Sequence, residues 1–540
     1  MSGTVLEQPL PTFHPFLATD VWRLLTNQAE RRADETFMTW QPFEGDSVTW
    51  TYGQFHRQAL ATAAGLQERG VREGDRVLIH LANRPEFLLA WFACAALHAI
   101  AVTTNARSSS DELAYFLADS GATVAVTEPA FAGVVAAAGP GLRWIAVAGA
   151  PSEAADLAFA DLIADSTKAV LPVPDPAAPL SIQYTSGTTS RPKGVLWTHA
   201  NGLWAARVSA SHQALRADDV HLVYMPLFHA NALAYSVLPT LWAGAGFVLI
   251  PKWSTSRFWD ISLRHGCTWL STMLLSARAV MALPSPPRHS YRVIAGPTAP
   301  DFGQKLGVET IAWWGMTETV SQGIMTDGQR VDRECIGRVA PEYEVMVLGP
   351  DGSPARPDQT GELLIRGVRG LSMFAQYWND PEATRESFDE DGWFATGDLV
   401  RPNPDGTLSF MDRVKDMLRV GAENVAASEI ERVILEATGP GEVAVVGRPD
   451  EKLDEVPVAF VCVEDAPGNL AERVLAACRA KLADFKVPRE VHVVVAMPHS
   501  TISKVSKVEL REVAAAPEGL AAAQERWVAA AMSDPSGDAE

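Results

Sequence analysis

Two spacings of apolar residues alternate along the first 130 positions of the chain. Apolar residues between Phe55 and Leu66 recur at helical spacing, and Gly70 follows as a stop signal. Further helices are expected after Pro85 and over 111–117. Short apolar runs predict strands at 76–80, 100–103, 122–127 and 180–184. This alternation predicts parallel sheets covered by helices.

The pattern changes twice further along. Four prolines between 171 and 180 predict a stiff extended connector. Residues 337–410 carry short apolar runs separated by Gly-Asp and Pro-Asp turns, which predicts a β-rich subdomain. We therefore expect an α/β chain whose large N-terminal domain has two helix-covered sheets plus a β-rich subdomain.

A separate unit follows a charged stretch at 412–416. Helices are expected at 427–437 and 470–485, and strands at 443–446 and 457–463. This is enough for a small α+β C-terminal domain. The Ala-rich end, 514–540, predicts a surface helix with a frayed tail.

Composition and charge narrow the function. The chain has 540 residues, of which 47% are hydrophobic and 20% charged, and this excludes wholesale disorder. A formal charge of -20 argues against nucleic acid as a partner, since that needs clustered positive charge. A local loop can still bind an anionic small ligand.

Cysteines and apolar runs bear on the compartment. None of the five cysteines forms a C-x-x-C pair, and no Cys/His cluster has zinc spacing, which favours reduced thiols in a cytoplasmic protein. The N-terminus lacks a basic region followed by an apolar run, so no signal peptide is expected. The longest apolar stretch, 87–102, contains His98 and falls short of the ~20 residues of a transmembrane helix.

The strongest chemical signal is the segment 184–194, which reads YTSGTTSRPKG. Small residues after a strand let backbone N–H groups approach phosphate oxygens, hydroxyls donate further bonds, and Lys193 supplies charge. The Walker A spacing is absent. The competing interpretation is a flexible solvent loop.

This loop resembles the phosphate-binding signature of the adenylate-forming superfamily, which includes acyl-CoA synthetases, carrier-linked adenylation domains and firefly-type luciferases. Further motifs follow in the order of that family, and together they cover roughly residues 20 to 515. These motifs are AGPTAP at 295–300, WWGMTE at 313–318, YW at 377–378 with GWFATGD at 392–398, DRVKD at 412–416 and the lysine loop at 498–510.

The resemblance implies a domain organisation and a set of ligands. It implies an N-terminal adenylate-forming domain at 1–412 that binds ATP and the acyl substrate, a hinge at 413–416, and a mobile C-terminal domain at 417–540. ATP, Mg²⁺ and coenzyme A are the expected cofactors. The residues expected around the nucleotide and the thiol are Thr185, Ser186, Gly187, Thr188, Thr189, Lys193, Gly296, Pro297, Thr298, Trp313, Trp314, Gly315, Met316, Thr317, Asp398, Phe410, Arg413, Lys415, Gly421, Ala422 and Lys504.

Individual roles on the nucleotide side also follow from the resemblance. Glu318 and Thr185 are expected to hold Mg²⁺, which takes one or two carboxylates plus phosphate oxygens. Trp314, where the family more often has Tyr, is expected to stack on adenine; core packing is the alternative. Asp398 is expected on the ribose hydroxyls, as in dinucleotide folds, and turn capping is the alternative.

The C-terminal roles concern the hinge and the lysine loop. Arg413 is expected to reach the ribose or a phosphate, and Lys415 to be the position whose dihedral rotates. Lys504 aligns with the catalytic lysine, with Lys507 as the rival assignment. Solvent-exposed linker charges are the alternative for the hinge pair.

Three positions carry another residue where the family has glycine. Ser190 and Ser503 replace it in the phosphate and lysine loops. Ala422 stands in the loop that, in the resemblance, lines the tunnel for the pantetheine arm. An added methyl narrows a channel or fixes its backbone, so either the thiol still fits or the second half-reaction is weak.

The segment 225–232 matches the family's segment beside the acyl pocket. His229 is expected to orient or gate the substrate rather than bind a metal, since no partner ligands lie at suitable spacing; a packed core histidine is the alternative. The small residues Ala230, Ala232 and Ala234 favour a bulky or long hydrophobic acid.

The expected function is a two-step ligase: a carboxylate attacks the α-phosphorus of ATP, pyrophosphate leaves, and CoA then takes the acyl group. Lys504 would serve the first step, and rotation of the C-terminal domain about Lys415 the second. The alternatives are an enzyme that loads a carrier protein in trans, a luciferase, and an inactive nucleotide-binding regulator. A homodimer is left open.

Overall fold

The computed structural model describes residues 14–185, 192–296, 300–326, 335–349, 351–413, 416–420, 423–450, 453–464, 466–482, 484–499 and 505–532. The chain divides into two compact units. One comprises Met1–Val345 and Ile365–Phe394, and the other Met346–Leu364 and Ala395–Glu540. Part of the β-rich segment thus groups with the C-terminal region, while the expected boundaries 1–412, 413–416 and 417–540 stay predictions.

The first unit contains an eight-stranded sheet in the order β20-β9-β8-β4-β3-β5-β6-β7. Its strands are β3 (Arg76–His80), β4 (Ile100–Thr103), β5 (Val124–Thr127), β6 (Trp144–Val147), β7 (Leu157–Ala158), β8 (Pro179–Thr185), β9 (Lys193–Thr198) and β20 (Gln376–Tyr377). Strands β8 to β7 are parallel along this order, and β9 returns antiparallel to β8. The apolar runs predicted these strands because a sheet covered on both faces needs continuous apolar residues.

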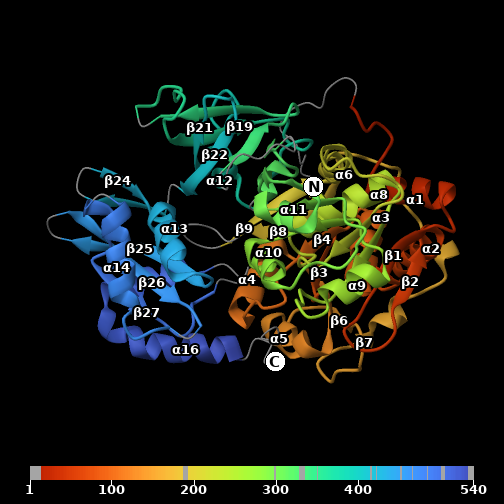
Figure 1. Cartoon of the computed structure of the whole chain (residues 1–540). Coiled ribbons are helices and arrows are strands. Elements are labelled where there is room, and N and C mark those ends of the chain that lie inside the picture. Colours follow the sequence, from red (N-terminus) through yellow and green to blue (C-terminus); the bar gives the residue numbers. More distant parts are fainter. Residues whose placement is uncertain are drawn as a thin grey trace. The chain divides into compact units, whose positions relative to one another are not determined.

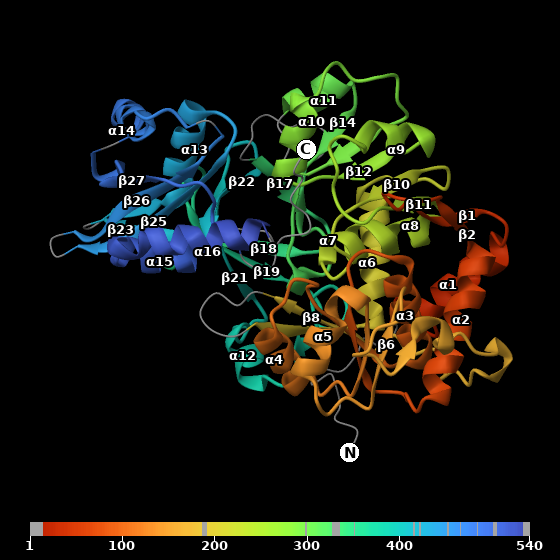
Figure 2. The same ribbon diagram turned by 90° about the horizontal axis from the view of Figure 1, so that it is seen from below.

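Helices cover both faces of this sheet (Figures 1 and 2). Leu78 packs in one core cluster with α4 (Ser110–Ser120) and α5 (Pro129–Ala138). Its neighbours Val77 and Ile79 pack in the other cluster with α2 (Tyr52–Glu68) and α3 (Pro85–Leu97). Because strand side chains alternate, one apolar strand serves both layers. Helices α2, α3 and α4 confirm the ones expected from the sequence, whereas α5 was not predicted.

A second, seven-stranded sheet in the same unit has the order β14-β13-β12-β10-β11-β1-β2. Its strands are β1 (Thr36–Trp40), β2 (Val48–Thr51), β10 (Val220–Val223), β11 (Gly246–Leu249), β12 (Trp269–Ser271), β13 (Val293–Ala295) and β14 (Glu309–Ile311). All but β2 run parallel, so their carboxyl ends meet at one edge. Ligands of open parallel sheets bind at that edge.

Several further helices in the described part of this unit accompany the sheets. They are α1 (Val21–Arg31), α6 (His199–His212), α8 (Leu238–Ala243), α9 (Phe258–Arg264), α10 (Leu274–Ala282), α11 (Pro300–Leu306) and α12 (Pro381–Glu386). Residues of α1, α6 and α8 share one core cluster with both sheets.

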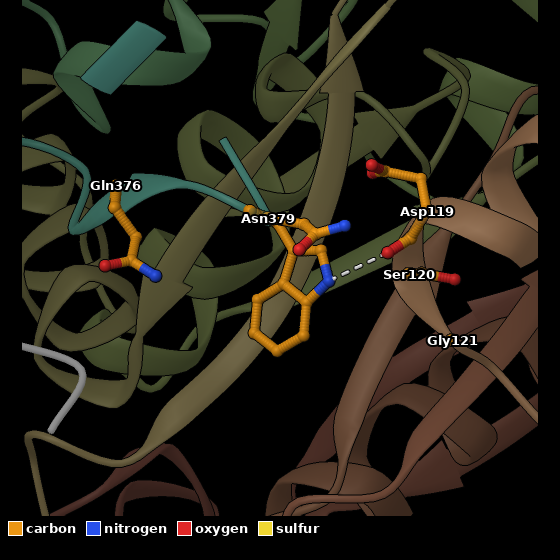
Figure 3. A pocket seen from close by; sticks show the side chains of 6 residues that line it. Asp119, Ser120, Gly121, Gln376 and Asn379 are labelled. Carbon is orange, nitrogen blue, oxygen red and sulfur yellow. Dashed lines mark hydrogen bonds between the residues drawn. The ribbon is translucent and has the colours of Figure 1, made fainter. Parts of the chain in front are cut away.

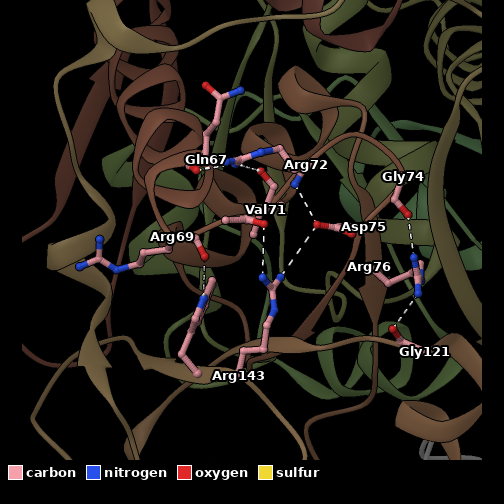
Figure 4. A network of polar contacts seen from close by, with 11 residues as sticks. Gln67, Arg69, Val71, Arg72, Gly74, Asp75, Arg76, Gly121 and Arg143 are labelled. Atoms are coloured by element: carbon pink, nitrogen blue, oxygen red, sulfur yellow. Dashed lines mark hydrogen bonds and ion pairs between the residues drawn. The ribbon is translucent and has the colours of Figure 1, made fainter.

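Arginines tie together the turns at the amino edge of the first sheet (Figure 4). Arg76 donates to the carbonyls of Gly74, Ser120 and Gly121 at 2.9–3.0 Å. Arg143 donates to the Gly70 carbonyl at 3.3 Å. Their donors therefore satisfy turn carbonyls, which indicates a structural role for this edge.

The β-rich segment contributes short strands to both units. The first unit holds β15 (Trp313–Trp314), β16 (Ile324–Met325) and β17 (Cys335–Val339). The second unit holds β22 (Leu408–Arg413) and all of β21 (Phe394–Pro402) except its first residue, while β18 (Glu344–Leu348) and β19 (Gly361–Arg366) also span the division. The predicted strand-rich pattern is confirmed.

The C-terminal region folds as a five-stranded sheet between two helix layers. Its strands are β23 (Met417–Val420), β24 (Glu423–Ala426), β25 (Glu442–Asp450), β26 (Asp454–Cys462) and β27 (Glu490–Val493). Helices α13 (Ala427–Thr438) and α14 (Leu470–Lys481) pack on one face. Helices α15 (Lys507–Ala515) and α16 (Leu520–Met532) pack on the other, where Trp527 is 4% exposed. The expected surface helix at the chain end is therefore partly a core helix.

Candidate active site

The ends of the expected phosphate loop are fixed by a hairpin. Thr185 is the last residue of β8 and Lys193 the first of β9, and the two are paired across the hairpin. The Thr185 hydroxyl donates to the Lys193 carbonyl at 3.4 Å. Ser186, Gly187, Thr188 and Thr189 lie outside the described residues. The loop thus leaves from the carboxyl end of a parallel strand and returns at a lysine.

Glu318 lies in a short 3₁₀ turn, Thr317–Thr319, and is 5% exposed. The turn is held from two sides. The Trp197 indole N–H donates to the Thr317 carbonyl at 2.9 Å, and the Phe374 backbone N–H donates to the Glu318 carbonyl at 2.8 Å. The carboxylate itself accepts from the Tyr377 hydroxyl at 2.9 Å on Oε1. A buried carboxylate held this way has a defined direction.

Lys193 and Glu318 meet on the same tyrosine. The Lys193 ammonium lies 4.8 Å from the centre of the Tyr377 ring, whose hydroxyl binds Glu318. The ring has 6% exposure. A basic side chain and a carboxylate therefore lie beside the ends of the 186–191 segment. Their roles toward phosphate and Mg²⁺ stay predictions.

The residues present fit a nucleotide-bound Mg²⁺. Within the described residues no group of three or more His, Cys, Asp and Glu side chains could hold a metal ion. Mg²⁺ is commonly held by one or two carboxylates together with substrate phosphates and water, so the single buried Glu318 suffices. The ion would neutralise phosphate charge, and Glu318 and the Thr185 hydroxyl are the residues that would hold it.

The aromatic motif 313–318 places its two tryptophans differently. Trp314 is 6% exposed, pairs with Ile324 and accepts on its carbonyl from the Gly323 N–H at 3.1 Å. Trp313 is half-buried and stacks on Trp269 with ring centres 6.2 Å apart. Stacking of Trp314 on adenine stays a prediction.

Glycine is required at two motif positions. A Cβ on Gly315 would lie 2.6 Å from the Tyr235 hydroxyl. Gly296 follows β13 with a φ of +144°, and a Cβ there would lie 2.4 Å from the Thr272 carbonyl. Both backbones therefore approach neighbours too closely for any side chain. Pro297 and Thr298, which follow Gly296, lie outside the described residues.

The segment expected beside the acyl group follows β10 at the carboxyl edge of the second sheet. His229 precedes the turn α7 (Ala230–Ala232), and its ring centre lies 4.2 Å from that of Phe228. The chain then forms a π-helix over Leu233–Val237. π-Helical turns are often found at functional sites.

Asn231 is the polar member of this segment. Its Oδ1 accepts from the Ser271 hydroxyl at 3.0 Å. Ser271 ends β12, so this bond joins α7 to the carboxyl edge of the sheet. The expected small residues Ala230, Ala232 and Ala234 are buried, with exposures of 9%, 0% and 0%.

The second unit carries the residues expected on ribose and at the hinge. Asp398 in β21 is 3% exposed and lies directly opposite Arg413 of β22. Phe410 is half-buried in the same hairpin, and its pairing with Val400 follows a register shift. The backbone alone places Arg413. Lys415, Gly421, Ala422 and Lys504 lie outside the described residues.

The sequence did not single out two residues that the structure places in the site. Tyr377 was noted only as part of a motif, although its hydroxyl binds Glu318, which lies 59 positions earlier. Asn231 was read only as a neighbour of His229. The sequence shows each of them only as a polar or aromatic residue within a largely apolar segment. That pattern does not predict which residue will be its hydrogen-bond partner.

These features define a class of protein. Two helix-covered sheets, a hairpin beside a buried glutamate, and a separate unit that contains an α+β sheet and the β21–β22 hairpin are the parts expected of an adenylate-forming enzyme. The family of AMP-binding enzymes matches residues 25–378, and its C-terminal domain matches residues 429–504. The chain belongs to the AMP-binding enzyme family.

Curated and solved relatives agree with this placement. The crotonobetaine/carnitine–CoA ligase of Salmonella heidelberg is 32% identical over 497 residues, which cover 88% of this chain and 96% of that protein. The anthranilate CoA ligase AuaEII in complex with anthranoyl-AMP has a TM-score of 0.81 and 25% identity over 95% of this chain and 99% of its own. The o-succinylbenzoate CoA synthetase of Bacillus subtilis, solved with AMP, has a TM-score of 0.78 and 25% identity over 92% and 98%.

The chain is an AMP-forming acid–thiol ligase, an acyl-CoA synthetase, whose cofactors are ATP, Mg²⁺ and CoA. It activates a carboxylic acid as the acyl-adenylate and transfers the acyl group to CoA. An inactive regulator is thereby excluded. Among the described residues no helix is long and apolar enough to cross a membrane.

Proposed function

We propose that the substrate is a carboxylic acid whose body carries a second polar group, of the carnitine type or a substituted aryl acid. The observation that carries this proposal is the hydrogen bond between Ser271 and Asn231, which holds an amide within the acyl segment. A purely hydrocarbon substrate would desolvate that amide without offering a partner, which costs about 1–3 kcal/mol. An acid whose second group forms a hydrogen bond with the amide, or is a cation attracted by the amide oxygen, avoids the cost.

The relatives support the same class. The relatives are named for crotonobetaine, carnitine, anthranilate and o-succinylbenzoate. Each of these acids has a polar group besides the carboxylate that is activated. The segment that carries Asn231 also contains Phe228, whose ring centre lies 4.2 Å from that of His229. Aromatic faces suit both aryl rings and quaternary ammonium groups.

The division of labour among residues is part of this proposal. Lys193 and the hydroxyls of the 185–189 loop would bind the β- and γ-phosphates, with Glu318 and Thr185 toward Mg²⁺. Asp398, Arg413 and Phe410 would hold the ribose end. Lys504 would place its ammonium between the carboxylate and the α-phosphate, stabilising the in-line transition state. A turn at Lys415 would then withdraw Lys504, so that the thiol can attack.

The test is a panel of acids scored by pyrophosphate release: crotonobetaine, carnitine, anthranilate, benzoate and a long-chain fatty acid. We expect kcat/KM to be highest for acids with a second polar group. Asn231→Leu should lower kcat/KM for that acid by about tenfold to hundredfold, as expected for the loss of a half-buried polar partner of the substrate. Ser236→Ala removes a hydrogen bond to the Asn231 carbonyl but keeps the amide, so it is the matched control. A fatty acid that exceeds every polar acid would refute the proposal.

A bulky or long hydrophobic acid is the second candidate. It is favoured by the small side chains Ala230, Ala232 and Ala234, but these are buried against the protein. A carrier protein acting in trans is a further possible acceptor besides CoA, and a thioester assay with each measures which one the enzyme prefers. We place the enzyme in the cytoplasm, which fits its free cysteines, and a homodimer is a proposal that light scattering tests.

A further inference from the structure

Tyr377 contacts both charged groups of the nucleotide site and has so far no role in the reaction. Its hydroxyl donates to Glu318 Oε1 at 2.9 Å, and its ring carries the Lys193 ammonium 4.8 Å from the ring centre. One side chain thus touches the carboxylate that would hold Mg²⁺ and the cation that would bind the phosphates. Its 6% exposure removes most competing water.

The backbone around Tyr377 is held firmly to the phosphate hairpin. In β20, Gln376 pairs with Leu196 and Tyr377 with Val195 of β9. The Trp378 backbone N–H donates to the Gly194 carbonyl at 2.6 Å, next to Lys193. Strand β20 is therefore an extension of the hairpin that carries the loop.

The next side chain anchors the same segment on its other side. The indole N–H of Trp378 donates to the Asp119 carbonyl at 3.2 Å, at the end of α4 (Figure 3). Both residues line a pocket together with Ser120, Gly121, Gln376 and Asn379. Two consecutive aromatic residues thus point to opposite sides: Trp378 fixes the strand, and Tyr377 reaches the site.

We propose that Tyr377 is a positioning residue for the metal–phosphate chemistry: it sets the direction of the Glu318 carboxylate and holds the Lys193 ammonium beside the phosphate loop. The inference rests on the proposed placement of Mg²⁺ at Glu318. A hydrogen bond to a charged acceptor fixes direction as well as adding energy, and a cation over an aromatic face is confined without being neutralised. Outer partners of metal ligands typically change metal affinity 10–100-fold.

The test separates the two contacts of Tyr377. Tyr377→Phe keeps the ring and removes only the hydroxyl. We expect the Mg²⁺ concentration that half-saturates nucleotide binding to rise by about 10–100-fold, while ATP binding in EDTA stays unchanged. Tyr377→Leu also removes the ring and should weaken ATP binding in EDTA. Calorimetry of ATP binding, and the spectrum of Mn²⁺ in place of Mg²⁺, give readouts that do not require turnover.

Two controls keep the inference falsifiable. Tyr52→Phe removes another buried tyrosine hydroxyl, bonded to the Ala245 carbonyl at 2.6 Å, and should leave the Mg²⁺ dependence unchanged. In a Glu318→Gln background, Tyr377→Phe should not raise the half-saturating Mg²⁺ concentration any further, because the Tyr377 hydroxyl acts through the Glu318 carboxylate. The positioning role of Tyr377 would be overturned if Tyr377→Phe had the half-saturating Mg²⁺ concentration of the wild type, or if the effects of the two substitutions were additive in the double variant. No acid is present, so an error in the proposed substrate class would leave these results unaffected.

Discussion

Lys507 forms an ion pair with Glu431 at 2.8 Å, and both side chains are largely buried, with exposures of 18% and 17%. Burial by itself would lower the pKa of Lys507, but Glu431 and the aspartates at 412 and 416 raise it above its ordinary value. The Lys507 side chain is therefore charged and held in an ion pair with Glu431 inside the C-terminal unit. This position argues against the rival assignment of Lys507 as the catalytic lysine.

Lys507→Met is expected to destabilise the C-terminal unit, because it leaves the buried Glu431 without its cation. Removing one partner of a buried pair costs about 3–5 kcal/mol. The matched control is Lys481→Met, which breaks an exposed ion pair with Glu436. Glu436 lies on α13, as Glu431 does, and the loss of this exposed pair should cost about 1 kcal/mol or less. Chemical denaturation of both variants measures the difference. Equal losses would contradict the structural role of the Lys507 pair.

Lys504→Ala should act differently, on one half-reaction only. We expect acid-dependent pyrophosphate release to fall by about 100- to 1000-fold, as for loss of a group that stabilises developing charge. Thioester formation from supplied acyl-AMP and CoA should change little, because the proposed mechanism withdraws Lys504 before that step. Loss of the same size in both half-reactions would refute the assignment, as would a selective loss of the first half-reaction in Lys507→Met.

The sequence predicted most of the fold because burial leaves a local pattern. Strand β3 was expected at its observed bounds, Arg76–His80, since a strand covered by helices on both faces is apolar throughout. The helix expected over 470–485 instead ends at Lys481, because the backbone is extended at Leu482 and a 3₁₀ turn carries Phe485. Phe485 continued the apolar pattern without continuing the helix.

The site was predictable as motifs but not as contacts. Spacing identified Lys193 and Glu318 as separate charged residues, but not that Tyr377 touches both. That contact depends on β20 joining β9, a pairing of segments about 180 residues apart whose two-residue strand leaves almost no periodic signal. The sequence likewise could not predict that Trp314 is buried, with 6% exposure. An aromatic residue at this position suits core packing and base stacking equally well.

Acid should destabilise the protein through histidines buried in the first unit. Burial lowers the pKa of His221 to about 3, although the Asp219 carboxylate acts in the opposite direction. No described residue offers a hydrogen-bond partner to either of its ring nitrogens. Burial also lowers the pKa of His199 to about 3 and that of His80 to about 4.

The sign follows from which state takes up the proton. Below pH 6.5 the unfolded chain binds a proton at His221, whereas the folded chain does not bind it until about pH 3. The free energy of unfolding therefore falls as the pH drops from 6.5 to about 3. Each such histidine contributes about 1.4 kcal/mol per pH unit. His221→Leu should therefore flatten the pH dependence of stability by about this slope between pH 6 and 4, measured by denaturation in urea. Parallel curves for the variant and the wild type would show that His221 titrates normally in the folded state.

Gly315→Ala should disturb the nucleotide motif by steric conflict. The new methyl would lie 2.6 Å from the Tyr235 hydroxyl and 3.0 Å from the Ser321 carbonyl. Overpacking of this kind costs about 1–3 kcal/mol, and we expect lower stability together with weaker ATP binding. Tyr235→Phe removes the nearer of the two oxygens and leaves the ring in place. The double variant Tyr235→Phe/Gly315→Ala should therefore regain much of the stability and ATP affinity, as measured by thermal unfolding and calorimetry. If the double variant is no better than Gly315→Ala alone, the requirement for glycine comes from the Ser321 carbonyl or from the nucleotide itself, and the contact with Tyr235 is not what excludes a side chain at this position.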